Sequence, residues 1–141
     1  MSRNPWLIVG GCLSLAASLL HIGCIIGGPD WYRFLGAGEA MAQAAERGEA
    51  YPALVTLAIW CAYAFAGAGL IRRLPLMRTA LVAITAIYLL RGAALIPALT
   101  VPEMSSPFNI WSSVIVLGYG LVYAIGTWRA WPSLSPEGKP A

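Results

Sequence analysis

Four apolar stretches separated by short polar segments dominate the chain, at residues 6–27, 52–71, 79–99 and 107–128. Each contains about the 20 residues that an α-helix needs to cross the hydrocarbon core of a bilayer. The pattern predicts an all-α protein, an integral membrane four-helix bundle. Because the four stretches occupy most of the chain, we expect a single transmembrane domain over residues 1–141.

Proline stands at or near the start of three of these stretches. Asn4-Pro5 and Ser106-Pro107 each place a capping side chain before a proline, and Pro52 begins the second stretch. Proline is favoured in the first turn of a helix because the N–H that it lacks would have no partner there. We therefore expect these helices to begin at the prolines.

The longest connection is the outer loop at residues 28–51. Its Gly-Pro-Asp sequence at residues 28–30 predicts a turn. Over residues 34–47, apolar positions recur at helical spacing opposite polar ones, which predicts a short amphipathic helix. Such a helix is expected to lie on the membrane surface over the mouth of the bundle.

Basic residues indicate the orientation, because short loops rich in lysine and arginine remain in the cytoplasm. One side of the spans carries Arg3, Arg72, Arg73, Arg78, Arg129 and Lys139. The loop at residues 28–51 instead has two arginines against four carboxylates. We therefore expect both termini, including the tail at residues 129–141, to be cytoplasmic.

Composition supports a membrane protein and narrows the partners. Hydrophobic residues make up 59% of the chain and charged residues 11%, against roughly 45–50% and about 25% in soluble domains. The net charge of +3 follows from the orientation of the spans, so we expect no nucleic-acid partner. One lysine beside eight arginines, with abundant alanine and glycine, favours a multi-pass protein of a bacterial inner membrane.

Few residues could support catalysis or bind a metal. Cys12, Cys24 and Cys61 lie inside predicted spans and are expected to be buried, unpaired thiols. The single histidine, His21, has no evident nucleophile or base to act with, and with Cys24 it supplies too few donors for a metal site. The sequence thus predicts no metal and no cofactor, and it argues against an enzyme without excluding one.

Arg91 is the most informative residue, because an arginine near the centre of a bilayer costs about 2.5–3.5 kcal/mol on insertion scales. It follows Arg78 by about 20 Å of helix, and His21 follows Trp6 by about 22 Å, so both should lie at one level in the outer half of the membrane. Arg91 could extend to the outer interface or pair with an acidic residue of the outer loop. Glu39 is the best candidate for that counter-ion.

Each span also has one mildly polar or aromatic face, which we expect to point inward. The faces hold the inter-helix hydrogen bonds of a stable bundle, or they line a cavity that opens toward the outer leaflet and suits a small anionic or amphiphilic ligand. The candidate ligand-binding residues are Arg91, His21, Glu39, Tyr88, Trp60, Thr56, Ser112 and Tyr119. Membrane lipid is expected to surround the outer faces, and the Gly23-x-x-x-Gly27 motif is compatible with close helix packing or a homo-oligomer.

The four spans, the longer first outer segment and the short arginine-rich joint resemble the DoxX-like small bacterial membrane proteins, and more distantly the four-helix sterol-isomerase-like bundles. The Gly-Gly-Pro-Asp-Trp-Tyr-Arg-Phe-Leu-Gly-Ala-Gly-Glu segment that ends at Glu39 also looks like segments of small inner-membrane proteins. The resemblance implies an accessory subunit of a quinone-linked redox system. The sequence is therefore compatible with three functions: ligand binding, a redox accessory, and a membrane interaction partner or immunity-type protein.

Overall fold

The computed structural model describes residues 3–134, which form helices joined by short turns. The helices are α1 (Pro5–Gly27), α2 (Pro29–Phe34), α3 (Glu39–Glu46), α4 (Tyr51–Gly67), α5 (Met77–Ala93), α6 (Leu95–Thr100), η1 (Pro102–Met104), α7 (Pro107–Ala130) and η2 (Trp131–Leu134). No β-strand occurs within residues 3–134, and the all-α prediction is confirmed for this part of the chain.

Three helical segments are long and apolar enough to cross a membrane: Pro5–Gly27, Met77–Thr100 and Pro107–Leu134. Helix α4 has 17 residues, or about 25 Å, which is shorter than the roughly 30 Å of a hydrocarbon core. It passes the same test only together with α3, from which it is bent by 91°. By length and composition the described residues therefore have three candidate spans, or four if the bent pair is one span.

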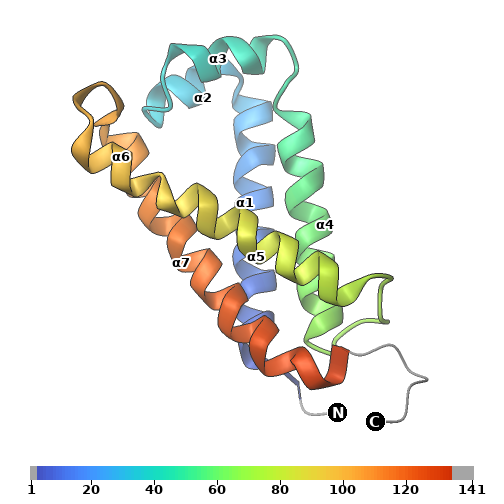
Figure 1. The fold of residues 1–141 in the computed structure, drawn as a ribbon. Coiled ribbons are helices and arrows are strands. Elements are labelled where there is room, and N and C mark those ends of the chain that lie inside the picture. The colour runs from blue at the N-terminus through green and yellow to red at the C-terminus, as the bar shows by residue number, and fades with distance from the viewer. Residues whose placement is uncertain (1–2, 135–141) are drawn as a thin grey trace.

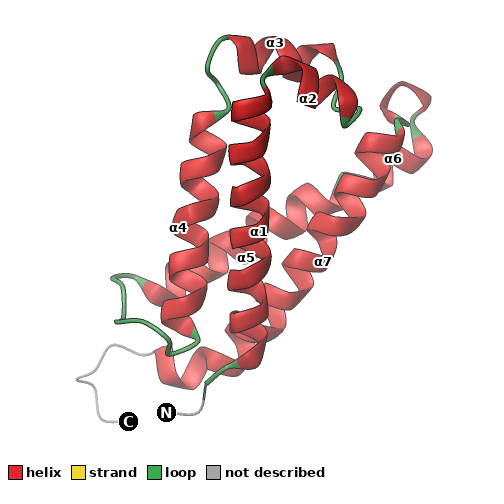
Figure 2. Ribbon diagram, turned by 180° about the vertical axis from the view of Figure 1, so that it is seen from behind, coloured by secondary structure: helices red, strands yellow, loops and turns green. Residues whose placement is uncertain are grey.

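The four long helices form two pairs. Figures 1 and 2 show α1 beside α4 and α5 beside α7, with the second pair running diagonally across the first. At one end, called the closed end, the pairs meet: α1 and α5 begin there, and α4 and α7 finish there. At the opposite, open end the pairs diverge, and α2 and α3 lie over the end of α1 and the beginning of α4.

The predicted helix starts are correct where a capping side chain precedes a proline. The Oδ1 of Asn4 accepts hydrogen bonds from the amides of Trp6 and Leu7, and the Oγ of Ser106 accepts one from the amide of Asn109 at 3.1 Å. These acceptors satisfy amides of the first turn that have no partner within the helix.

Two predicted spans differ from the observed helices. The stretch at residues 52–71 leaves the α-helix after Gly67, and Gly69 adopts a φ of 77°, which a residue without a Cβ adopts readily. The stretch at residues 79–99 is divided at Ala94 into α5 and α6. Pro97 explains the division, because it has no N–H and its ring collides with the carbonyl three to four residues earlier.

The hydrophobic core lies toward the closed end. It includes Leu7, Leu81 and Tyr123, which are all fully buried, from three different helices. Close contact between α5 and α7 depends on small residues: a Cβ on Gly92 would lie 2.6 Å from the Cα of Leu117. Small residues that let two backbones approach are typical of helix pairs in membranes.

The outer loop forms a two-helix cap, defined here as α2 and α3. The predicted amphipathic helix is confirmed as α3, which is shorter than expected because Gly36 and Gly38 have positive φ. The turn predicted at residues 28–30 is wrong beyond Gly28, since Pro29 begins α2. Gly27 leaves room for the indole of Trp31 from α2, because a Cβ at residue 27 would collide with the ring.

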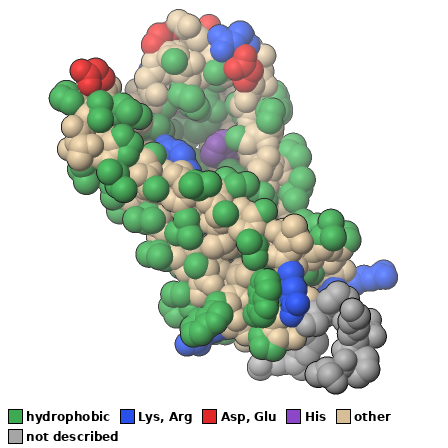
Figure 3. All heavy atoms as spheres, in the orientation of Figure 1, with side chains coloured by type: hydrophobic (Ala, Val, Ile, Leu, Met, Phe, Trp, Pro, Cys, Tyr) green, Lys and Arg blue, Asp and Glu red, His purple; other side chains and the backbone are tan. Residues whose placement is uncertain are grey.

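The outer surface of the long helices is apolar. Ile26, Leu90 and Trp128 are each about three-quarters or more exposed, and apolar side chains cover much of the face seen in Figure 3. A soluble protein does not usually expose apolar surface so extensively. This surface is compatible with contact with lipid along α1, α5 and α7.

Candidate ligand cavity

A cavity of about 410 Å³ lies between the two helix pairs at the open end, beneath the cap. Its lining residues come from α1 (Ala16, Ala17, Leu20, His21, Cys24), from the cap and its turn (Tyr32, Leu35, Ala37, Met41), from α4 and α5 (Leu57, Tyr88), and from α7 and its first turn (Phe108, Trp111, Ser112, Ile115, Val116, Tyr119). Figure 3 shows the molecule hollowed here, with the histidine and a basic side chain visible inside. The walls are mainly apolar and aromatic, as in most small-molecule sites.

His21 supplies a polar group on the α1 side of the cavity. Its Nδ1 lies 2.8 Å from the carbonyl oxygen of Ala17, one helical turn earlier. A carbonyl oxygen can only accept, so Nδ1 must carry the hydrogen. The Nε2 atom is therefore the nitrogen that remains to accept a hydrogen bond from a ligand, or to donate one when the ring is protonated.

Arg91 does not line the cavity itself but contacts Ser112, which does. Its guanidinium donates to two consecutive hydroxyls of α7, from Nη1 to Ser113 at 2.9 Å and from Nη2 to Ser112 at 3.2 Å. Ser112 lines the cavity, whereas Arg91 and Ser113 line a neighbouring hollow of about 160 Å³ beside Asn109. Among the residues that the structure describes, no carboxylate lies within 4 Å of this guanidinium.

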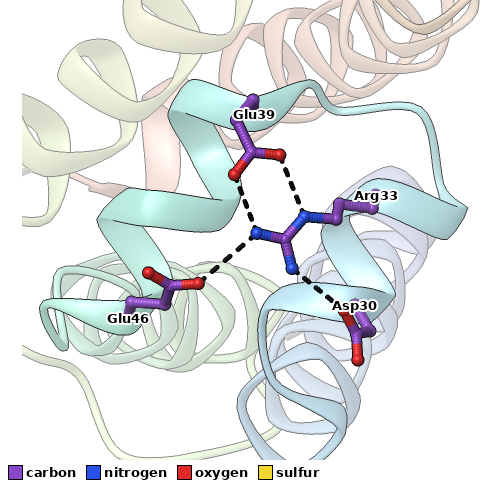
Figure 4. Close-up of polar contacts among 4 residues, drawn as sticks. All are labelled: Asp30, Arg33, Glu39 and Glu46. Carbon is purple, nitrogen blue, oxygen red and sulfur yellow. Dashed lines mark hydrogen bonds and ion pairs between the residues drawn. The ribbon is translucent and has the colours of Figure 1, made fainter.

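Glu39 is not the counter-ion of Arg91, so that prediction is wrong. It forms a two-point ion pair with Arg33, with nitrogen–oxygen distances of 2.9 and 2.7 Å, and Arg33 also contacts Asp30 at 2.9 Å and Glu46 at 3.4 Å (Figure 4). The hydrogen bonds from Arg33 lower the pKa of the Glu39 carboxyl. The tight turn between α2 and α3 brings these two residues together, and the exposed cluster ties the two cap helices to each other.

A buried hydroxyl network lies beneath the cavity. The Oγ of Ser14 is 3.0 Å from the hydroxyl of Tyr88 and 2.7 Å from that of Tyr123, and Tyr123 also donates to the carbonyl of Trp60 at 3.3 Å. The Tyr88 ring, which forms part of the cavity floor, packs edge-on against Trp60 and Tyr119. The network thus links α1, α4, α5 and α7 directly below the site.

The structure brings only some of the predicted residues together. His21, Tyr88, Ser112 and Tyr119 line the cavity, while Arg91 is one hydrogen bond away and Trp60 lies below the floor. Thr56 lies elsewhere: it is exposed, and its hydroxyl donates to the carbonyl of Pro52 in the preceding turn. Serine and threonine hydroxyls commonly make this bond within a helix, so a polar residue on a helix face need not point inward.

Sequence reasoning missed the aromatic wall on α7. Phe108 and Trp111 line the cavity and pack edge-on, with ring centroids 5.2 Å apart. The sequence signal for this face is helical spacing: Phe108, Trp111, Ile115 and Tyr119 follow one another by three or four residues, and Ser112 adjoins Trp111.

The thiols are unpaired in the structure. Cys24 and Cys61 are buried as expected, whereas Cys12 is exposed on the surface of α1, so the prediction is wrong for that residue. Within residues 3–134 no three histidine, cysteine, aspartate or glutamate side chains form a group that could hold a metal ion.

Comparison of the chain with protein-family models, with curated proteins and with solved structures gives no match in any of the three. The resemblance to DoxX-like proteins therefore remains a prediction.

Proposed function

We propose that this protein is a multi-pass membrane protein that binds a small amphiphilic molecule in the cavity beneath the cap. In this proposal α1, α5 with α6, and α7 cross the membrane, and α4 makes a fourth crossing, with the cap outside the bilayer. The basic residues then place both termini in the cytoplasm, so the cap and the cavity lie toward the outer leaflet. A bacterial inner membrane is the proposed location.

The distribution of polar groups around the cavity carries the proposal. Aromatic and aliphatic side chains form most of the wall, while His21 on α1 and the Ser112–Arg91 pair supply polar groups. A few placed polar groups in an otherwise apolar pocket fix the orientation of a ligand that has one polar and one apolar part. The cavity volume of about 410 Å³ is within the range of about 300–1,000 Å³ for small-molecule sites.

A substitution that fills the cavity tests the proposal without removing a polar group. Ala16 lines the cavity on α1 and is exposed, so Ala16→Phe introduces a ring at the site. Ala58→Phe makes the same chemical change on an exposed position of α4 that does not line the cavity. It is therefore the matched control.

Native mass spectrometry of the protein released from mild detergent measures the occupancy. The wild type and Ala58→Phe should each carry one amphiphile per chain, either from the cell membrane or after addition of tetradecanoic acid and tetradecanol. Ala16→Phe should lose this adduct while keeping its helical circular-dichroism spectrum. Equal occupancy of the two variants, or a wild type that takes up neither molecule, would refute ligand binding in this cavity.

A further inference from the structure

The rim of the cavity indicates from which medium a ligand enters. Leu20 on α1 and Trp111 and Ile115 on α7 line the cavity and are also 46%, 40% and 46% exposed. An opening that served water-soluble molecules would be expected to carry polar or charged side chains, because these line aqueous paths in membranes. The apolar rim instead matches the hydrocarbon chains of lipid, so a ligand can enter sideways from the bilayer.

The charge at the site indicates the headgroup. Arg91 contributes one positive charge, and its hydrogen-bond partners Ser112 and Ser113 are neutral. No carboxylate of the described chain lies within 4 Å of it. An unneutralised charge is unfavourable in a medium of low dielectric constant. A ligand with a single negative charge would neutralise the guanidinium, whereas a dianion would leave an excess negative charge.

The geometry of the polar groups supports the same headgroup. Ser112 is both a hydrogen-bond partner of Arg91 and a lining residue of the cavity, and His21 lines the cavity from α1. A headgroup at Ser112 would therefore meet a hydroxyl beside a guanidinium, and His21 is a further polar residue of the same lining. The aromatic rings of Phe108 and Trp111 are available to the apolar part of the same molecule.

We infer that the ligand is a single-chain amphiphile with a monoanionic headgroup, taken from the bilayer between α1 and α7. This inference rests on the proposed function and adds to it the charge of the ligand and its route of entry. A carboxylate and a phosphodiester share the required charge, and the two are distinguished by experiment. One chain is inferred because the cavity has the volume of a small-molecule site.

Four probes with the same tetradecyl or tetradecanoyl chain separate charge from hydrophobicity: tetradecanoate, lysophosphatidylglycerol, tetradecanol and tetradecyltrimethylammonium. Their affinities are measured by isothermal titration into protein held in phosphatidylcholine nanodiscs, with empty nanodiscs subtracted. Arg91→Gln removes the charge at the site, and Arg47→Gln is the control because Arg47 is paired with Glu49 outside the cavity. Ala16→Phe fills part of the cavity and should weaken the binding of all four probes.

At least one of the two anions should bind the wild type about tenfold more tightly than the alcohol, as expected for one charge-assisted contact. Arg91→Gln should lose this preference while still binding the alcohol, which also shows that the variant is folded. Should Arg91→Gln not fold, Ser112→Ala tests the same contact by removing one hydroxyl that holds the guanidinium. The stronger of the two anions identifies the headgroup as a carboxylate or a phosphodiester.

Equal affinities for the anions, the alcohol and the ammonium compound would overturn the inference and leave the proposed function standing. An anion preference that survives in Arg91→Gln, or that is undiminished in Ser112→Ala where that variant is used, would also overturn it. Failure of all four probes to bind the wild type would instead refute the proposed function itself.

Discussion

The hydroxyl network beneath the cavity gives a quantitative prediction for Tyr123→Phe. Tyr123 is fully buried, and its hydroxyl lies 2.7 Å from Ser14 and 3.3 Å from the carbonyl oxygen of Trp60. The substitution removes one oxygen atom and leaves the ring in place. Side-chain hydrogen bonds between membrane helices average about 0.6 kcal/mol and reach about 1.7 kcal/mol. The loss of two such bonds should therefore lower the free energy of unfolding by about 1–3 kcal/mol.

Titration with sodium dodecyl sulfate, followed by circular dichroism, measures this free energy for protein in mild detergent micelles. Tyr119→Phe is the control, because this ring also packs on Tyr88 but its hydroxyl has no hydrogen-bond partner among residues 3–134. It should change stability much less than Tyr123→Phe. The double variant with Ser14→Ala should show a coupling energy of about 0.5 kcal/mol or more, as is usual for residues in one network. Strict additivity, or equal effects of the two tyrosine substitutions, would contradict the network as described.

Two further predictions concern the cap. The Arg33–Glu39 pair lowers the pKa of Glu39, so its stabilising effect is present at neutral pH and is lost as the pH falls through that lowered pKa. Protection factors, which correct for the pH dependence of intrinsic amide exchange, should therefore fall for α2 and α3 on acidification of the wild type. Glu39→Gln should already have low protection factors there at neutral pH, and unchanged protection in this variant would contradict a stabilising role of the ion pair. Gly27→Val should displace the Trp31 ring and shift the tryptophan fluorescence to the red. It should also lower the free energy of unfolding by about 1–3 kcal/mol, as is typical of overpacking. Gly118→Val, where a Cβ meets no atom within 4 Å, should leave the spectrum unchanged. A similar shift in both variants would contradict the packing of Trp31 against Gly27.

Local signals account for the parts of the fold that the sequence predicted well. The starts of α1 and α7 depend on a capping side chain and a proline that are adjacent in sequence, so no distant contact is needed to locate them. The break at Ala94 was missed although Pro97 is visible in the sequence. Apolar content was continuous through this region, and it indicates a span without indicating whether the helix within that span is unbroken.

The candidate site was harder to predict because each polar side chain has several possible hydrogen-bond or ion-pair partners, and the sequence does not show which one it contacts. Glu39 was assigned to Arg91 by charge alone, but Arg33 is only six residues away, and the turn between the cap helices brings it closer. Thr56 satisfies its hydroxyl within its own helix. Helical spacing groups residues such as Ser112 and Tyr119 on one face of a helix, whereas the hydrogen bonds of each side chain depend on three-dimensional contacts.

Asn4 joins the ends of three helices at the closed end. Its Oδ1 caps α1, its Nδ2 donates to the carbonyl of Gly126 in α7 at 2.8 Å, and its amide lies 3.4 Å from the carbonyl of Ala68 after α4. Helix α7 has 24 residues and is about 36 Å long, so a change of its angle near this asparagine would have its largest effect at the far end of the helix. A rotation of about 5° there would move the far tip of α7 by about 3 Å. A substitution at Asn4 would therefore also be felt at the α7 wall of the cavity, at the opposite end of the molecule.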